Sequence, residues 1–270
     1  ASGGTSTAMG YNSTASGEQS FAVGNSRASG YGSIALGNSD ASGQESVAIG
    51  RTVFASGKWA IALGSGQTSA SGDFSTALGF ANQATGNIST TMGDHTTASG
   101  YNSTTMGAYT TAIGDYSTSI GFRSIASDYN SLIIGQNNLL GSTVTNSATS
   151  FNTENTAFVI GNGVNADNKS DALTVLFDGT TTIAGDLSIN SDARLKANII
   201  SLGSTLAKIL QIDGKTYTMK KDENKKQKIG VLAQDVQKVF PELVSESNGI
   251  KSVNYQGLVP VLINALKEQD

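Results

Sequence analysis

Two residues of this sequence stand out for the chemistry that their types and spacing allow. Ser191 and Lys196 lie five positions apart in the segment SDARLKANI. A serine hydroxyl becomes a nucleophile when a neighbouring base takes its proton, and a lysine is such a base when burial favours its neutral amine. A structural interpretation competes with this one, because Ser and Asp ahead of an apolar helical pattern commonly cap the start of a helix.

Helix geometry limits how this pair can meet. Side chains five residues apart on one α-helix point about 140° away from each other. A Ser/Lys dyad therefore requires that Ser191 lies on an extended lead-in, or that a neighbouring chain completes the site. Apolar residues at helical spacing predict a helix over about 194–211. Further patterns predict strands near 215–219, 228–232 and 250–254, and helices near 233–239, ended by Pro241, and 256–268.

Charge and composition change at about residue 190. Residues 1–190 carry 5 Lys and Arg against 12 Asp and Glu, whereas residues 191–270 carry 12 against 9, and 27 of the 32 glycines lie in the first part. The absence of Cys excludes disulfides and thiolate chemistry. No apolar run is long enough for a transmembrane helix, and no signal peptide is visible. Because the sequence begins within a repeat pattern, we expect it to be cut from a longer protein.

The first part is dominated by a short repeat. A small residue, an aliphatic residue and Gly recur every 13 to 15 residues, as in AVG ending at Gly24, ALG at Gly37 and AIG at Gly50. A second unit, usually ASG, lies between them, as at Gly30 and Gly43. Each coil of about 14 residues therefore consists of two halves of about seven.

These halves predict a parallel β-solenoid. A Gly in every seventh position disfavours a coiled coil, Gly is not at every third position as in collagen, and the nonapeptides of calcium-binding rolls are absent. Ser, Thr, Ala and Val suit short strands joined by tight Gly turns. Neither face of the strands is strongly polar, so we expect the opposite half-coil to cover one face and another chain to cover the other.

The segments ESVAIG, YGSIALG and GDFSTALG resemble the YadA-type head of trimeric autotransporter adhesins over about residues 5–136. The resemblance implies a trimeric, left-handed parallel β-roll that is extracellular and adhesive. We assign it residues 1–136. Residues 137–190 have strand character, with Asp178-Gly179 as a hairpin turn, and are expected to form a β connector or the fibre tip.

The last part resembles the endosialidase-type intramolecular chaperone of phage tail spikes. Its opening SDARLKANI and the blocks IGVLAQDVQKVFPELV and VNYQGLVPVLINALKEQ carry this similarity, over residues 191–270. The resemblance implies a small α+β domain that assists trimerisation of the upstream fibre and then removes itself. Carried over to this chain, Ser191 is the nucleophile, Lys196 the base, and Asn190–Ser191 the scissile bond. No cofactor and no metal are implied.

Other residues received structural interpretations. His95 is expected on a surface turn. The aromatic residues are expected either to line a sugar-binding strip or to pack at chain interfaces, and the lysine run over 220–228 to be a solvated loop with no nucleic-acid partner. The aromatic residues in question are Trp59, Tyr101, Tyr109, Tyr116 and Phe122.

The favoured function is a homotrimeric extracellular adhesin fibre that binds a cell-surface glycan or protein receptor. The first alternative is a phage tail fibre or tail spike for host recognition. A less favoured one is an ice-binding solenoid, prompted by pairs such as Thr90-Thr91 and Thr104-Thr105, although Thr alternates there with Val and Ile, which favours burial. A glycan-degrading spike would need paired carboxylates, and the acids of the first part are scattered singly.

Overall fold

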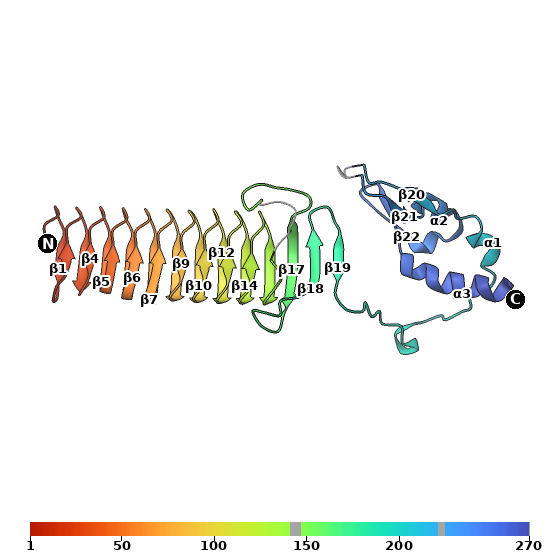
Figure 1. Cartoon of the computed structure of the whole chain (residues 1–270), viewed down its shortest axis with the longest axis horizontal. Helices are drawn as coiled ribbons and strands as arrows, with labels where there is room; N and C mark the ends of the chain where they lie inside the picture. The colour runs from red at the N-terminus through yellow and green to blue at the C-terminus, as the bar shows by residue number, and fades with distance from the viewer. Residues whose placement is uncertain (141–146, 221–224, 270) are drawn as a thin grey trace. The chain divides into compact units, whose positions relative to one another are not determined.

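The computed structural model describes residues 1–140, 147–220 and 225–269. The chain divides into two compact units, Ala1–Leu187 and Ser188–Asp270, which are described separately (Figure 1). Within the described ranges, no helix combines the length and the apolar character that crossing a bilayer requires.

The first unit is mainly β and contains a β-solenoid of about nine turns over residues 7–136, as the repeat predicts. Coils stack in parallel and in register: Thr90 pairs with Thr104, which pairs with Thr118, so that each step advances one repeat. The strands are β1 (Thr7–Met9), β2 (Thr14–Ala15), β3 (Phe21–Gly24), β4 (Arg27–Ala28), β5 (Ile34–Ala41), β6 (Val47–Ala55), β7 (Ile61–Ala70), β8 (Thr76–Phe80), β9 (Gln83–Ala84), β10 (Thr90–Asp94), β11 (Thr97–Ala98), β12 (Thr104–Ala108), β13 (Thr111–Ala112), β14 (Thr118–Phe122), β15 (Ile125–Ala126) and β16 (Leu132–Gln136).

The core of the solenoid is built from the small residues. The residue before the aliphatic position points inward and is buried from the second coil onward, as Ala48 and Ala62 are, whereas Ala8 in the first coil is partly buried. The other half-coil supplies a second column of buried alanines such as Ala55. A coil of about 14 residues encloses so little space that Ala, Ser and Thr fill it. The expected cover by the opposite half-coil is therefore confirmed.

The aliphatic residues face outward instead. Ile49, Met92 and Ile120 are 37%, 41% and 36% exposed in the single chain. They form a row along successive first strands, because the register aligns each with its counterpart in the next coil. The expectation that another chain covers this row stays a prediction.

The threonine pairs are split between the two faces. Thr91 and Thr105 are fully buried, whereas Thr90 and Thr104 point outward beside Met92 and Met106. The burial expected for these pairs is thus confirmed for the inward member. On the outward face of β10 and β12, Thr alternates along the strand with Met, and the ice-binding alternative stays a prediction that the structure does not favour.

Some glycines are required because coils stack so closely. A Cβ at Gly86 would lie 2.8 Å from the carbonyl carbon of Gly100 in the next coil and nearer still to its oxygen. At Gly93 the backbone also has φ of +130°, a region that side chains with a Cβ rarely adopt.

Beyond β16 the chain closes the solenoid with a different topology. Strand β17 (Thr156–Asn162) still pairs in parallel with β16, but β18 (Asp171–Leu176) and β19 (Thr181–Ile183) are antiparallel. The predicted hairpin turn is confirmed, with Gly179 at φ of +87° between β18 and β19. Part of the segment that we assign to the connector, residues 141–146, lies outside the described residues.

The second unit is a small mixed domain. Its elements are the 3₁₀ turn η1 (Ala193–Leu195), α1 (Leu206–Ile209), β20 (Lys215–Tyr217), β21 (Lys228–Gly230), α2 (Ala233–Val239), η2 (Pro241–Leu243), β22 (Val244–Ser247), β23 (Ile250–Val253), η3 (Tyr255–Gly257) and α3 (Leu258–Gln269). Buried Val236, Phe240 and Val261 form its core. The predicted strands and the two later helices are confirmed within a few residues, and β22 was not anticipated.

The helix expected over 194–211 is wrong. Only η1 and the single turn α1 are helical there. Asn198 and Gly203 have φ of +54° and +66°, which ends any continuous helix, and Ile199 is 66% exposed. Apolar residues at helical spacing do not form a helix without a surface to pack on.

Candidate functional site

Ser191 and Lys196 lie in hydrogen-bond contact. The Lys196 Nζ donates to the Ser191 Oγ at 2.7 Å. Ser191 precedes η1 and Lys196 follows it in extended conformation, with φ of −118° and ψ of 146°. The two side chains therefore meet across a tight turn and not along a helix, which is the arrangement that the extended lead-in requires.

Asp192 shapes this turn. Its carboxylate accepts from the Arg194 backbone N–H at 2.8 Å, and its own carbonyl accepts from the Leu195 N–H. The Lys196 N–H then donates to the Ala193 carbonyl. Capping by Asp192 and the 3₁₀ bonds reverse the chain within four residues, so the ends of the turn approach each other.

An ion pair fixes the same carboxylate from the side. The Arg194 guanidinium donates to Asp192 through Nε at 3.0 Å and through Nη2 at 2.7 Å. These side-chain bonds, followed by the backbone bond from Arg194, lower the pKa of Asp192, and the Asp192 carboxylate raises the pKa of Arg194. Sequence reasoning assigned Asp192 and Arg194 no role beyond capping, although both stand inside the motif.

The bond between Asn190 and Ser191, where cleavage is expected, is accessible. Asn190, Ser191 and Lys196 are all exposed in the single chain. In this contact the amine donates a hydrogen bond to the hydroxyl, whereas a general base accepts the hydroxyl proton. Burial disfavours a charged ammonium. The single chain holds the two groups in place but leaves them in water.

Hydrogen bonds to α3 hold residues 204–206, which follow the Ser191–Lys196 turn in the chain. Glu268 of α3 accepts from the Ser204 hydroxyl at 2.6 Å and from the backbone N–H groups of Thr205 and Leu206, at the start of α1. The Thr205 hydroxyl donates to the Val261 carbonyl at 2.9 Å. These hydrogen bonds, that from Ser204 first, lower the pKa of Glu268.

The other candidate residues of the sequence take structural positions. His95 lies on an exposed turn with φ of +52°, as predicted. The aromatic residues contact one another between coils: Trp59 with Phe74, Tyr101 with Tyr116, and Tyr109 with His95 and Phe122. They are exposed in the single chain, so the sugar-binding strip and the chain interface both stay predictions. Of the lysine run, residues 221–224 lie outside the described residues.

Comparison with known proteins places both parts of the chain. Residues 191–245 match the family model described as chaperone of endosialidase. The model of the YadA head domain repeat matches residues 1–26, 24–39, 41–66, 69–90, 93–117 and 112–138.

A curated relative is similar to part of the chain. The long tail fiber protein Gp37 of Escherichia phage AR1 is 31% identical over 100 residues, which cover 34% of this chain and 9% of that protein. The match thus spans about a tenth of the relative's length. Together with the solenoid and the Ser191–Lys196 turn, these similarities identify a fibre-like protein that carries YadA head repeats followed by a chaperone domain of the endosialidase family.

Proposed function

We propose that this chain is part of a phage tail fibre that contacts the host surface, and that its last domain helps three chains assemble and then cuts itself off between Asn190 and Ser191. The observation that carries the proposal is the 2.7 Å contact between Lys196 and Ser191 at the first residues of the chaperone match. Similarity to a phage long tail fiber protein favours a virion over a bacterial surface.

The cleavage uses the chain's own atoms. With Lys196 neutral, its amine takes the hydroxyl proton while the Ser191 Oγ attacks the carbonyl carbon of Asn190. The bond from this carbon to the Ser191 nitrogen breaks, and the nitrogen leaves as an amine that takes up the proton. Water then hydrolyses the ester between Asn190 and the Ser191 oxygen. The products are a carboxylate at Asn190 and a free amino group at Ser191, with one water consumed.

The proposed assembly is a trimer of left-handed parallel β-solenoids. The outward row on the first strands, which includes Ile49, Met92, Met106 and Ile120, is apolar and more than a third exposed in the single chain. Contiguous apolar surface of this kind favours burial against other chains. Within this scheme, residues 1–136 are the head, 137–190 a connector or tip, and 191–270 the chaperone.

Assembly and cleavage are coupled in this proposal. The single chain leaves the amine of Lys196 exposed, and packing of neighbouring chains around the turn removes water and favours the neutral base. Cutting therefore follows folding. The cleaved head would remain outside the cell on the virion.

Mass spectrometry of the purified protein tests the cleavage. The parent protein should yield two fragments, 1–190 and 191–270, whereas Ser191→Ala and Lys196→Met should stay intact while still forming trimers by light scattering. Ser201→Ala, at another exposed serine of the same segment, is the matched control and should cleave normally. An intact parent trimer, or cleavage that persists in Ser191→Ala, would refute the mechanism.

A further inference from the structure

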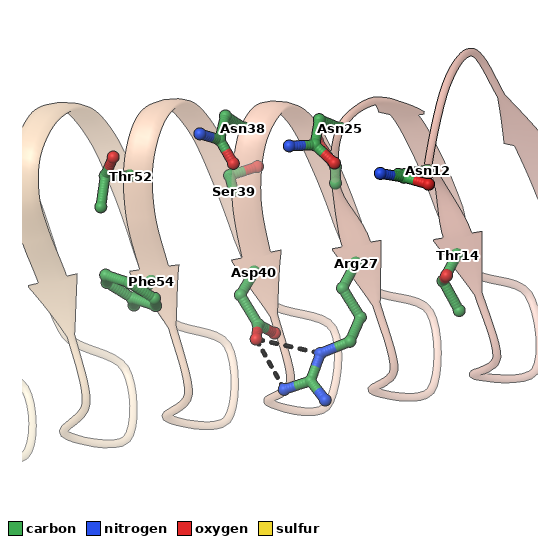
Figure 2. Close-up of a pocket in the computed structure, with 10 residues that line it drawn as sticks. Asn12, Thr14, Asn25, Arg27, Asn38, Ser39, Asp40, Thr52 and Phe54 are labelled. Atoms are coloured by element: carbon green, nitrogen blue, oxygen red, sulfur yellow. Dashed lines mark hydrogen bonds and ion pairs between the residues drawn. The ribbon is translucent and has the colours of Figure 1, made fainter.

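A groove of about 340 Å³ lies on one edge of the first coils of the solenoid, outside the chaperone domain and away from the cleavage turn in the sequence. Its lining comes from successive coils (Figure 2). The lining residues are Asn12, Thr14, Asn25, Ser26, Arg27, Asn38, Ser39, Asp40, Thr52 and Phe54.

The groove arises from a change in coil length. The register pairs Met9 with Val23, Leu36 and then Ile49 along one strand column, and Thr14 with Arg27, Asp40 and then Phe54 along the other. The turn between the columns has four residues in the outer coils and three in the two middle coils.

The outer turns bulge where the middle turns do not. Asn12 and Thr52 supply the extra residue, with φ of +54° and +61°, and the ladder shifts register opposite Thr52. The two middle turns, which carry Asn25 and Asn38, are therefore recessed between higher neighbours. Two adjacent turns each lack one residue that the neighbouring turns have. The hollow therefore comes from the path of the backbone and not from a gap between side chains.

The amides in the groove are available for a ligand. Asn12, Asn25 and Asn38 form a row along the turns, as Figure 2 shows. Their side chains are exposed and, in the part of the chain that the structure describes, make no hydrogen bond to the protein. Each amide offers both a donor and an acceptor, which matches the hydroxyl groups of a polyol.

The charges of the groove cancel. Arg27 donates through Nε at 3.0 Å and Nη2 at 2.6 Å to one oxygen of Asp40, in the next coil. The other oxygen, Oδ1, is buried without a donor, so the carboxylate keeps an unused acceptor. A paired arginine attracts a phosphate or sulfate much less than a free one, so the groove favours an uncharged ligand.

An aromatic ring closes one end of the groove. Phe54 is 40% exposed, and among the described residues no other ring packs against it, unlike His95 and Tyr109 further along the rod, whose rings stack at 5.0 Å. A free ring beside hydrogen-bonding groups is typical of sites for ligands with both apolar and hydroxyl surfaces.

We infer that this groove binds a neutral, linear oligosaccharide lying along the rod. Coils advance by about 4.8 Å, close to the length of one pyranose unit, so that successive sugars meet successive amides. One wall of the groove is the strand column of Thr14, Arg27, Asp40 and Phe54. The proposed trimer contact lies on the other strand column, which carries the apolar row, so it leaves this wall free. The inference extends the receptor-recognition part of the proposed function, on which it rests.

The test uses the full chain and an array of short neutral and anionic oligosaccharides, followed by calorimetry with the neutral glycan bound best. Asn25→Ala combined with Asn38→Ala should weaken binding about tenfold or more, the effect of two lost hydrogen bonds. The control is Gln83→Ala combined with Thr97→Ala, which lie in later coils on the strand column that continues from Arg27 and Asp40. This control should change binding less than twofold. Insertion of one Gly after Asn25 and one after Asn38 fills the recess and should abolish binding while circular dichroism stays unchanged.

Each result decides the matter. Equal affinity in the parent and in the groove variants would overturn the inference, as would selective binding of anionic glycans. If the parent binds no glycan on the array but adsorbs to host cells, this inference fails and the receptor role stands. If it adsorbs to no cell type, the proposed function fails.

Discussion

Replacement of Gly86 by alanine places a methyl group against the backbone of the next coil. The new Cβ would lie 2.8 Å from the Gly100 carbonyl carbon and 2.8 Å from the Ser99 oxygen. Real Cβ atoms essentially never come within 3.0 Å of such atoms, and backbone cannot rotate away as a flexible side chain can. The two coils must therefore separate locally.

The cost follows from the hydrogen bonds that join these coils. The N–H groups of Thr85 and Gly86 donate to the Ala98 carbonyl at 2.9 and 3.1 Å, next to the clash. Losing both at a buried position costs about 1–3 kcal/mol each. Alanine also lowers the conformational entropy of the unfolded chain, which stabilises the folded state by about 0.4–1 kcal/mol and offsets part of this loss. We expect the free energy of unfolding to fall by about 3 kcal/mol.

Gly185→Ala is the matched control. Nothing lies within 4 Å of a Cβ built at Gly185, so this variant keeps the effect on the unfolded chain without the clash. Guanidinium unfolding followed by circular dichroism should show Gly86→Ala destabilised by about 3 kcal/mol and Gly185→Ala unchanged or slightly stabilised. A Gly86→Ala variant within about 0.5 kcal/mol of the control would refute the stacking argument.

Three further predictions test the remaining parts. Asp192→Ala removes the cap of the turn, worth about 1 kcal/mol, and should slow self-cleavage about fivefold by mass spectrometry without changing the trimer. Ile120→Asp places a charge in the apolar row and should abolish both trimers and cleavage by light scattering and mass spectrometry, whereas Thr97→Asp on the other strand column should keep both. The folded domain lowers the pKa of Glu268, so the ionised carboxylate stabilises the fold above the unfolded pKa of about 4.3, and this stability is lost as pH falls through the folded pKa. Glu268→Gln should therefore reduce the acid dependence of thermal unfolding of the chaperone domain. An unchanged pH profile would contradict this.

The solenoid was predictable because its repeat is enforced by geometry. A coil that stacks in parallel must return to the same register, so Gly50 pairs with Gly64 and the spacing in the sequence is the spacing in the fold. The recess at Asn25 and Asn38 corresponds to two repeats of 13 residues where most have 14. The sequence alone does not show that this missing residue lies in the turn, because repeat length varies elsewhere in the chain as well.

The turn that joins Ser191 to Lys196 was only partly predictable. The need for an extended lead-in followed from helix geometry, and the contact of Ser191 with Lys196 is consistent with it. The expected helix did not form because Leu195 and Ile199, apolar at helical spacing, are 69% and 66% exposed, and the described residues of their own chain do not bury them. Apolar residues at helical spacing do not show whether the surface that would bury them belongs to the same chain or to another chain.

The shared register of the coils has a consequence for how such a chain changes over generations. A coil such as 90–103 pairs with the coils on either side of it in the same backbone register, so its removal joins two coils whose strands can pair in that register. Recombination between similar repeats can thus lengthen or shorten the rod by whole coils, about 4.8 Å each, without a new folding problem. The two shortened coils have turns of three residues, so exchange among the 14-residue coils cannot recreate them.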